Sequence, residues 1–127
     1  MTLLLDSHVA LWWENGDALS PAAKEAVEDP TRQVWCSAAS AWELAIKVRS
    51  GNLILDVPTM IDRLEADGIG IVNIDGHDAV AGGSLDWSHQ DPFDRVIVAQ
   101  ALRRRWTVVT RDRAILAFLD HDLAIRA

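Results

Sequence analysis

The chain has 127 residues, of which 50% are hydrophobic and 24% charged, and its formal net charge is -7. This length and composition predict one soluble globular domain over residues 1–127, and the single cysteine, Cys36, excludes an intramolecular disulfide and a thiolate zinc site. We expect a reducing cytoplasm, no signal peptide and no membrane association, because disulfides, a basic leader and long apolar stretches are all missing.

The N-terminal half of the chain alternates short apolar runs with helical patterns. Leu3–Leu5 is an unbroken apolar run, which is typical of a strand covered on both faces. Ser20-Pro21 pairs a capping residue with a proline at the first helical position, and Gly51 is suited to end a helix. In chain order the pattern predicts a strand at Leu3–Leu5, helices at His8–Glu14 and Pro21–Glu28, a strand at Val34–Cys36 and a helix at Ser37–Ser50.

The C-terminal half continues the alternation and contains the strongest helical pattern. The predicted elements are a helix at Pro58–Asp67, a strand at Ile69–Ile74, helices at His77–Gly82 and Asp91–Arg105, a strand at Thr107–Thr110, a helix at Arg113–Leu119 and an edge strand at Leu123–Ile125. Such alternation predicts an α/β fold, with helices on both faces of a central, mostly parallel sheet of four to five strands. Ligands of these sheets bind beyond the carboxyl ends of the strands, so acids at that edge are candidate site residues.

Four acids are expected near that edge: Asp6, Glu43, Asp94 and Asp112. Three of them also have a structural explanation. Asp6 and Asp112 can cap the helices that follow them. Glu43 can complete a capping box with Ser40, and it can pair with Lys47 four residues later.

The stretch Asp91-Pro92-Phe93-Asp94 contains two aspartates, of which one is explained as a helix cap and the other is a candidate metal ligand. If Asp91 is the N-cap, Pro92 takes the first helical position and Asp94 the third. Asp94 then shares a face with the apolar residues three, four and seven positions later. A carboxylate at the end of this stripe is costly to bury unless a cation meets it, and no neighbouring side chain is expected to supply one. Mg²⁺ or Mn²⁺ would relieve the repulsion among all four acids.

A metal ion held by carboxylates is suited to the hydrolysis of phosphodiesters. The total charge argues against a nucleic-acid partner, because phosphate binding depends on lysine and arginine. Residues 89–113, however, hold six arginines and three aspartates, a local net charge of +3 against -10 elsewhere. Arg95, Arg111 and Arg113 lie closer to the acids than the run Arg103–Arg105 and are expected to bind nucleic-acid phosphate. The run Arg103–Arg105 also suits the negative end of a helix dipole.

These residues resemble the PIN-domain ribonucleases, in particular toxins of the VapC type from bacterial toxin–antitoxin pairs. The resemblance lies in four segments, which span nearly the whole chain in the order and spacing of the family. They are Leu3–His8 with Trp12-Trp13, Ser37–Lys47, His89–Arg95 and Val109–Asp112.

The resemblance implies a three-layer α/β/α PIN-like nuclease domain with the activity of a magnesium- or manganese-dependent endoribonuclease. Its metal-binding and catalytic quartet would be Asp6, Glu43, Asp94 and Asp112. Ser7 and Thr110 would support the metal ligands through their hydroxyls. Apart from the resemblance, Asp91 is expected to start its helix and to support the site as well. Family members usually form homodimers and are inhibited by a small antitoxin, sometimes within a larger assembly. The expected partners are therefore RNA, an antitoxin and a second copy of the chain.

Two other functions stay open on the sequence alone. Asp6, directly after a strand, is placed like the nucleophile of an aspartate-based phosphotransfer or phosphatase domain, although phosphatases of that kind carry a second aspartate where this chain has His8. The chain would alternatively be a PIN-like module that binds a protein without catalysis. The four histidines form no close ligand pair and are interpreted as surface or loop residues. Four tryptophans are assigned to the core or a dimer interface: Trp12, Trp13, Trp35 and Trp42.

Overall fold

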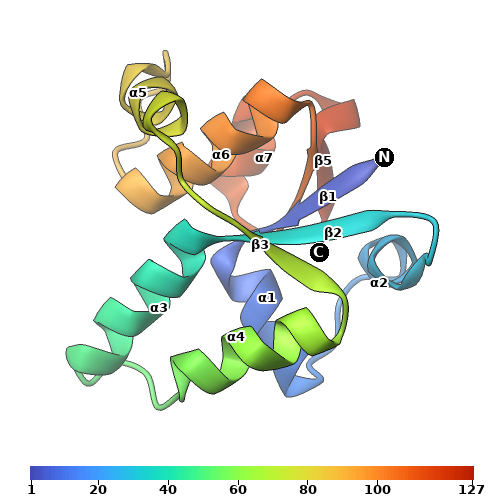
Figure 1. Ribbon diagram of the computed structural model, residues 1–127. Coiled ribbons are helices and arrows are strands. Elements are labelled where there is room, and N and C mark those ends of the chain that lie inside the picture. Colours follow the sequence, from blue (N-terminus) through green and yellow to red (C-terminus); the bar gives the residue numbers. More distant parts are fainter.

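Helices pack on both faces of a five-stranded sheet in the computed structural model, which describes all residues from 1 to 127 (Figure 1). The strands are β1 Thr2–Leu5, β2 Gln33–Ser37, β3 Ile69–Val72, β4 Thr107–Thr110 and β5 Ala124–Arg126. All pairings are parallel, and the strand order is β3-β2-β1-β4-β5. The predicted α/β class and parallel sheet are confirmed. β3 is shorter than predicted, because it ends at Val72 and not at Ile74.

Seven α-helices and one short 3-10 helix connect the strands. They are α1 Ser7–Asn15, α2 Pro21–Glu28, α3 Ala38–Arg49, α4 Val57–Ala66, α5 Gly76–Ser84, α6 Pro92–Arg104, α7 Arg113–Phe118 and η1 His121–Leu123. Every predicted helix is present, and the bounds differ by at most a few residues. None of them combines the length and the hydropathy that crossing a bilayer requires.

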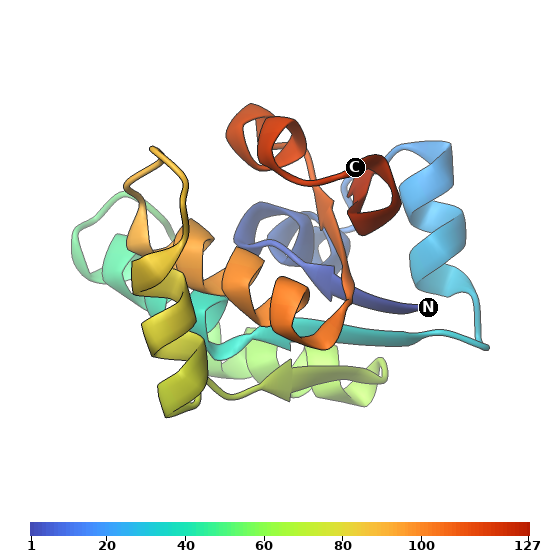
Figure 2. The same ribbon diagram turned by 90° about the horizontal axis from the view of Figure 1, so that it is seen from above.

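The core has two parts, one on each face of the sheet. Leu3 and Leu5 of β1 pack into a cluster with α1, α2 and α4, whereas Leu4 packs into a second cluster with α6 and α7. Figure 1 shows α1 and α4 on one side of the sheet and α5, α6 and α7 on the other, and Figure 2 shows α5 beside α6. A strand buried on both faces needs apolar residues at every position, which explains the run that begins the sequence.

A buried aspartate joins α5 to α6. Asp78 has no exposed surface, and it accepts hydrogen bonds from Arg104 Nη1 at 2.8 Å, from Arg104 Nη2 at 3.0 Å and from Arg103. Burial acts to raise the pKa of Asp78, but hydrogen bonds from Arg104, the backbone, Gln100 and Arg103 hold it well below its usual range. Two arginines of the basic run at the end of α6 are therefore bound within the protein.

Gly70 in β3 is required by the ring of Trp35 on the neighbouring strand. A Cβ atom at Gly70 would lie 2.6 Å from Cε3 and Cζ3 of Trp35, and that ring is stacked on Trp106 with centroids 5.6 Å apart. We expect Gly70→Ala to lower the free energy of unfolding by about 1–3 kcal/mol through overpacking, as measured by urea denaturation. Gly83→Ala is the control, because a Cβ atom there meets nothing within 4 Å. An equal loss in both variants would contradict this explanation.

Candidate active site

The four predicted acids lie at the carboxyl edge of the sheet. Asp6 directly follows β1, Asp112 follows β4, Glu43 lies on α3 and Asp94 is in the first turn of α6. Their charges interact: Asp112 repels both Asp6 and Asp94, and Glu43 repels Asp94. The structure thus brings the four carboxyl groups into one electrostatically coupled group, although they lie far apart in the sequence.

Asp6 is held from both sides of the site. It is 5% exposed, its Oδ1 accepts the backbone N–H of Val9 at 2.9 Å, and its Oδ2 accepts the hydroxyl of Thr110. Burial raises the pKa of Asp6 above its ordinary value of 3.8, and repulsion from Asp112 acts in the same direction, while hydrogen bonds from Thr110 and Val9 oppose it. The capping role predicted for Asp6 is confirmed, yet capping α1 employs only one of its two oxygens.

Thr110 joins Asp6 to Asp112. Its Oγ1 donates to Asp6 and accepts the backbone N–H of Asp112 at 3.0 Å. Asp112 in turn caps α7, because its Oδ1 accepts the N–H of Ile115 at 3.0 Å. One buried hydroxyl therefore sets the position of one acid and of the backbone that carries another.

Asp94 is the acid whose pKa is most clearly raised by its surroundings. Burial is the largest cause, the hydrogen bond from His89 opposes it, and repulsion from Asp91, Asp112 and Glu43 adds to it, so that the pKa reaches about 6. Asp91 caps α6 as predicted, since its Oδ1 accepts the N–H of Phe93 at 2.9 Å and of Asp94 at 3.0 Å.

His89 is a residue of the site that the sequence interpretation missed. Its Nε2 lies 2.8 Å from Oδ2 of Asp94, a hydrogen bond that the sequence did not predict, although a loop position was expected for this histidine. The position of His89, five residues before Asp94 in a loop, carries no helical or strand periodicity. The only sequence signal was its closeness to the Asp91–Asp94 stretch.

The surroundings of Glu43 differ from the prediction in one respect. The expected ion pair with Lys47 is present, with Nζ and Oε2 separated by 3.7 Å. The capping box with Ser40 is absent, because Ser37 caps α3 and Ser40 lies buried inside the helix. Ser40 instead accepts the hydroxyl of Ser7 at 3.0 Å. Ser7 was expected to support a metal ligand, whereas this bond ties α1 to α3.

Of the three arginines expected to bind phosphate, Arg95 is already bound to the protein. Its guanidinium donates to backbone carbonyls of the segment 82–89, at distances of 2.6 to 3.4 Å. The expectation that Arg95 binds RNA is therefore replaced by a structural role. Arg111 donates to the carbonyls of Ala127 and Ala18, and its Cζ lies 4.2 Å from the centroid of the Trp12 ring. Arg113 is exposed at the start of α7.

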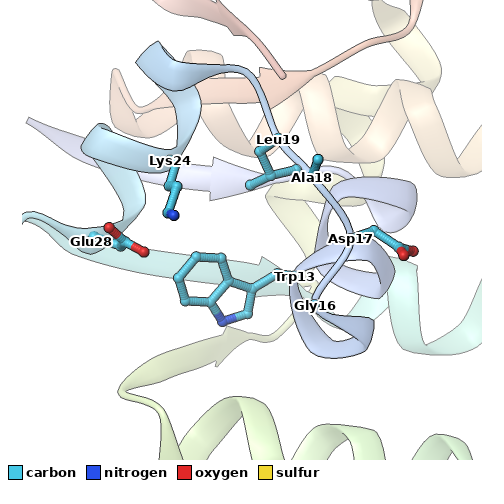
Figure 3. A pocket seen from close by; sticks show the side chains of 7 residues that line it. All are labelled: Trp13, Gly16, Asp17, Ala18, Leu19, Lys24 and Glu28. Atoms are coloured by element: carbon cyan, nitrogen blue, oxygen red, sulfur yellow. The ribbon is translucent and has the colours of Figure 1, made fainter.

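Three hollows are lined by residues of α1, and only one of them reaches the acids. A hollow of about 280 Å³ is lined by Asp6, His8, Trp12, Arg111 and Asp112. A larger one of about 520 Å³ lies between α1 and α2, where Lys24 and Glu28 face Trp13 (Figure 3). The larger hollow contains none of the four acids. The smaller one therefore opens beside two of the four acids, Asp6 and Asp112.

The residues present suit a hard divalent cation. No three His, Cys, Asp or Glu side chains lie at the spacing of a ready-made metal site. The four acids nevertheless offer only oxygen donors, and two of them, Asp6 and Asp94, are carboxyl groups whose ionised forms are disfavoured by burial. Mg²⁺ and Mn²⁺ prefer such oxygen donors, and a cation would stabilise the ionised forms. Asp6, Glu43, Asp94 and Asp112 are thus the side chains that would hold it.

Comparisons with known proteins identify relatives of the chain. The chain is 36% identical over 118 residues to Ribonuclease VapC22 of Mycobacterium tuberculosis, a match that covers 90% of this chain and 89% of that protein. A chain of a toxin–antitoxin complex from Klebsiella pneumoniae has the same fold, with a TM-score of 0.68 and 19% identity over 98% of this chain and 96% of that one.

A second solved structure, VapBC2 from Rickettsia felis bound to a DNA fragment from its promoter, contains a chain of the same fold, with a TM-score of 0.69 and 14% identity over 99% of this chain and 98% of that one. The model of the PIN domain family matches residues 3–119. Because this match and the relative at 36% identity each cover most of the sequence, the chain belongs to the PIN-domain family.

Proposed function

We propose that the chain is an endoribonuclease toxin of the VapC type, which hydrolyses RNA phosphodiester bonds with Mg²⁺ or Mn²⁺ and is inhibited by a cognate antitoxin. The observation that carries the proposal is the gathering of four acids at the carboxyl edge of the sheet, where the half-buried Asp94 has a pKa raised to about 6 by burial and by repulsion from Asp91, Asp112 and Glu43. Such a group is costly to keep ionised without a cation. The similarity to Ribonuclease VapC22 supports RNA as the substrate.

Each residue of the site has a distinct role in this mechanism. Asp6, Glu43, Asp94 and Asp112 would hold the cation, which would supply Lewis acidity for the phosphoryl group and the attacking water. Thr110 fixes the carboxylate of Asp6 and the backbone of Asp112. Asp91 fixes the first turn of α6, from which Asp94 projects. Water attacks phosphorus as the bond to the departing ribose oxygen breaks; the water gives up a proton, and the departing oxygen takes one up.

RNA would approach from the hollow beside Asp6 and Asp112. Arg111 borders this hollow and is held over Trp12, with two of its guanidinium nitrogens bound to backbone carbonyls. Arg113 is exposed one residue after Asp112. Both arginines remain proposed phosphate contacts, because the acids alone would repel a polyanion.

An antitoxin and a second copy of the chain are the proposed protein partners. An acidic hollow attracts a basic segment, and the solved relatives include a toxin–antitoxin complex. Homodimerisation is supported by large apolar side chains on α3 and α5 that are left exposed: Trp42 at 58%, Ile46 at 45% and Val80 at 68%. Trp42, assigned to the core or a dimer interface, is thus not in the core. Light scattering tests the dimer, and the same measurement with antitoxin added tests any larger assembly.

RNA cleavage by the purified chain, freed of antitoxin, tests the proposed activity. Defined RNAs incubated with Mg²⁺ or Mn²⁺ should be cut, and EDTA should abolish cleavage because the acids alone cannot activate water. Cleavage that persists in EDTA would contradict the metal-dependent mechanism. Intact-mass measurement after treatment with phosphate donors tests the phosphotransfer alternative, which requires a phosphoaspartate on Asp6. Absence of both cleavage and metal binding would favour the non-catalytic module.

Removal of the Thr110 hydroxyl should lower the rate of RNA cleavage, although all four acids of the site are still present. Thr110→Val keeps the shape of the side chain but leaves Oδ2 of Asp6 without its donor and the N–H of Asp112 without its acceptor. We expect kcat/KM for RNA cleavage to fall by about 10–100-fold, as is usual when a ligand loses its supporting hydrogen bond. Thr110→Ser restores the hydroxyl and should restore most of the activity. If the serine variant is as impaired as the valine variant, packing and not the hydroxyl is responsible.

A further inference from the structure

The ring of His89 makes a short contact to an acid of the proposed metal site. His89 Nε2 and Asp94 Oδ2 lie 2.8 Å apart, and the two side chains are 28% and 19% exposed. With Asp94 ionised, Nε2 must carry the proton and donate it, because a carboxylate only accepts. A carboxylate has about four acceptor positions on two oxygens, so this bond leaves Asp94 Oδ1 and part of Oδ2 free for a cation.

The loop that carries His89 is held from within the protein by Arg95. Arg95 Nη1 donates to the carbonyl of Trp87 at 2.6 Å and to the carbonyl of His89 itself at 2.9 Å. The other nitrogens donate to carbonyls of Gly82, Gly83 and Leu85, which lie at the end of α5 and directly after it. A planar guanidinium with five donors is suited to such a set of fixed acceptors.

The ring of His89 is also fixed by aromatic contacts. It packs against the ring of Trp87 with centroids 4.7 Å apart, and Trp87 is stacked on Phe118 of α7 with centroids 4.6 Å apart. The backbone and the ring of His89 are therefore both immobilised. A side chain that is already fixed loses little rotational freedom when it forms a hydrogen bond. The bond from His89 to Asp94 therefore forms at a low entropic cost and in one orientation.

We propose that His89 is a positioning residue, which holds the carboxylate of Asp94 in the orientation that binds the catalytic cation, and that Arg95 acts through His89. The inference rests on the proposed function, since it assumes a cation at the four acids. It differs from a role of His89 as a metal ligand, because Nε2 is directed at the carboxylate. It also differs from a role in which His89 competes with the cation for the carboxylate oxygens of Asp94 and so weakens cation binding.

Binding of Mn²⁺ to the full chain, measured by titration calorimetry without RNA, separates these roles. We expect His89→Ala to weaken Mn²⁺ binding by about 10–100-fold, the usual effect of losing a partner of a metal ligand. His89→Gln should stay within a few-fold of the wild type, because its amide nitrogen can donate from about the position of Nε2. His89→Asn, which is one carbon shorter, should behave as His89→Ala. His121→Gln is the control, because His121 is exposed and lies outside the site.

The proposed route through Arg95 is tested by a double-mutant cycle. Arg95→Lys should weaken Mn²⁺ binding in the wild-type background, since lysine cannot join the same carbonyls, but should change it little in the His89→Ala background. Additive losses would overturn the route through His89. Circular dichroism verifies that each variant is folded, and RNA cleavage by His89→Ala should recover at saturating Mn²⁺, which a damaged fold would not allow.

The outcomes distinguish this inference from the proposed function. If the wild type binds no Mn²⁺, the proposed function and the role of His89 are both overturned. If the wild type binds Mn²⁺ and His89→Ala binds it as tightly, or more tightly, the role of His89 alone is overturned. If His89→Gln loses as much affinity as His89→Ala, a donor at Nε2 is not what matters, and the positioning role is overturned as well.

Discussion

Asp94→Asn is expected to reduce RNA cleavage by roughly a thousand-fold or more, which corresponds to the several kcal/mol that a metal ion contributes to the transition state. The amide keeps the size of the side chain and one oxygen, but it loses the negative charge that attracts the cation. Asp94 is also repelled by three other acids, Asp91, Asp112 and Glu43. Its replacement should therefore affect cation binding more than any change outside the quartet.

The measurement is the single-turnover cleavage rate of a defined RNA at several Mn²⁺ concentrations. Asp62→Asn provides the matched control, because it removes the same charge from an exposed position on α4, away from the acids. We expect the control to cleave at the wild-type rate. Full activity of Asp94→Asn would contradict the assignment of Asp94 as a ligand, and equal losses in both variants would point to the overall charge of the protein.

Asp94 could be identified from the sequence because a charge breaks a regular pattern there. The apolar residues of α6 define a buried face, and Ile97, Val98 and Ala101 on that face are indeed buried. The carboxylate of Asp94 lies on the same face, and capping does not explain it, since Asp91 already caps the helix. Periodicity and cap chemistry are local properties, and they also placed all five strands and all seven helices.

The contacts that the sequence could not supply are those set by tertiary packing. Arg95 lies beside Asp94 in the sequence, which suggested a phosphate contact, yet its guanidinium is turned towards carbonyls of the segment 82–89. His89 meets Asp94 because that loop is folded back by Arg95. The pairing of Arg104 with the buried Asp78, 26 residues away, is hidden for the same reason. No local pattern encodes which loop returns to which helix.

The Ser40–Glu43 capping box failed through competition between two possible caps. Ser37 ends β2 and already accepts the N–H of Ala39, so α3 begins three residues earlier than a cap at Ser40 requires. Ser40 then falls in the helix interior, fully buried beside Ser7. A serine three residues before a glutamate permits the box, but the start of the helix decides whether it forms.

In the absence of divalent cations, the protein should become less stable as the pH rises from about 4 to above 6. The folded-state pKa of Asp94 is about 6, against an ordinary value of 3.8. Between these values the folded protein binds more protons than the unfolded chain, so the free energy of unfolding falls with increasing pH. The difference corresponds to a loss of about 3 kcal/mol, complete above the folded-state pKa. Asp6, whose pKa is also raised by burial, changes stability in the same direction.

Asp78 does not obscure this effect, because its pKa is shifted in the opposite direction. Its folded-state pKa lies well below 3.8, so its contribution is fully present above that value and is lost only as the pH falls further. The two groups therefore act in separate pH ranges. The range from about 4 to 6 reports on the carboxyl groups of the candidate site.

Urea denaturation in EDTA at a series of pH values measures the effect, with Asp94→Asn as the comparison. The variant cannot ionise at this position, so its stability should depend less on pH in this range and should exceed that of the wild type near neutral pH. Adding Mn²⁺ at about 100 times its Kd should return about 2.7 kcal/mol to the wild type, by preferential binding to the folded state. A variant as pH-dependent as the wild type, or a wild type that Mn²⁺ leaves unchanged, would mean that the charge of Asp94 is compensated inside the protein and needs no cation.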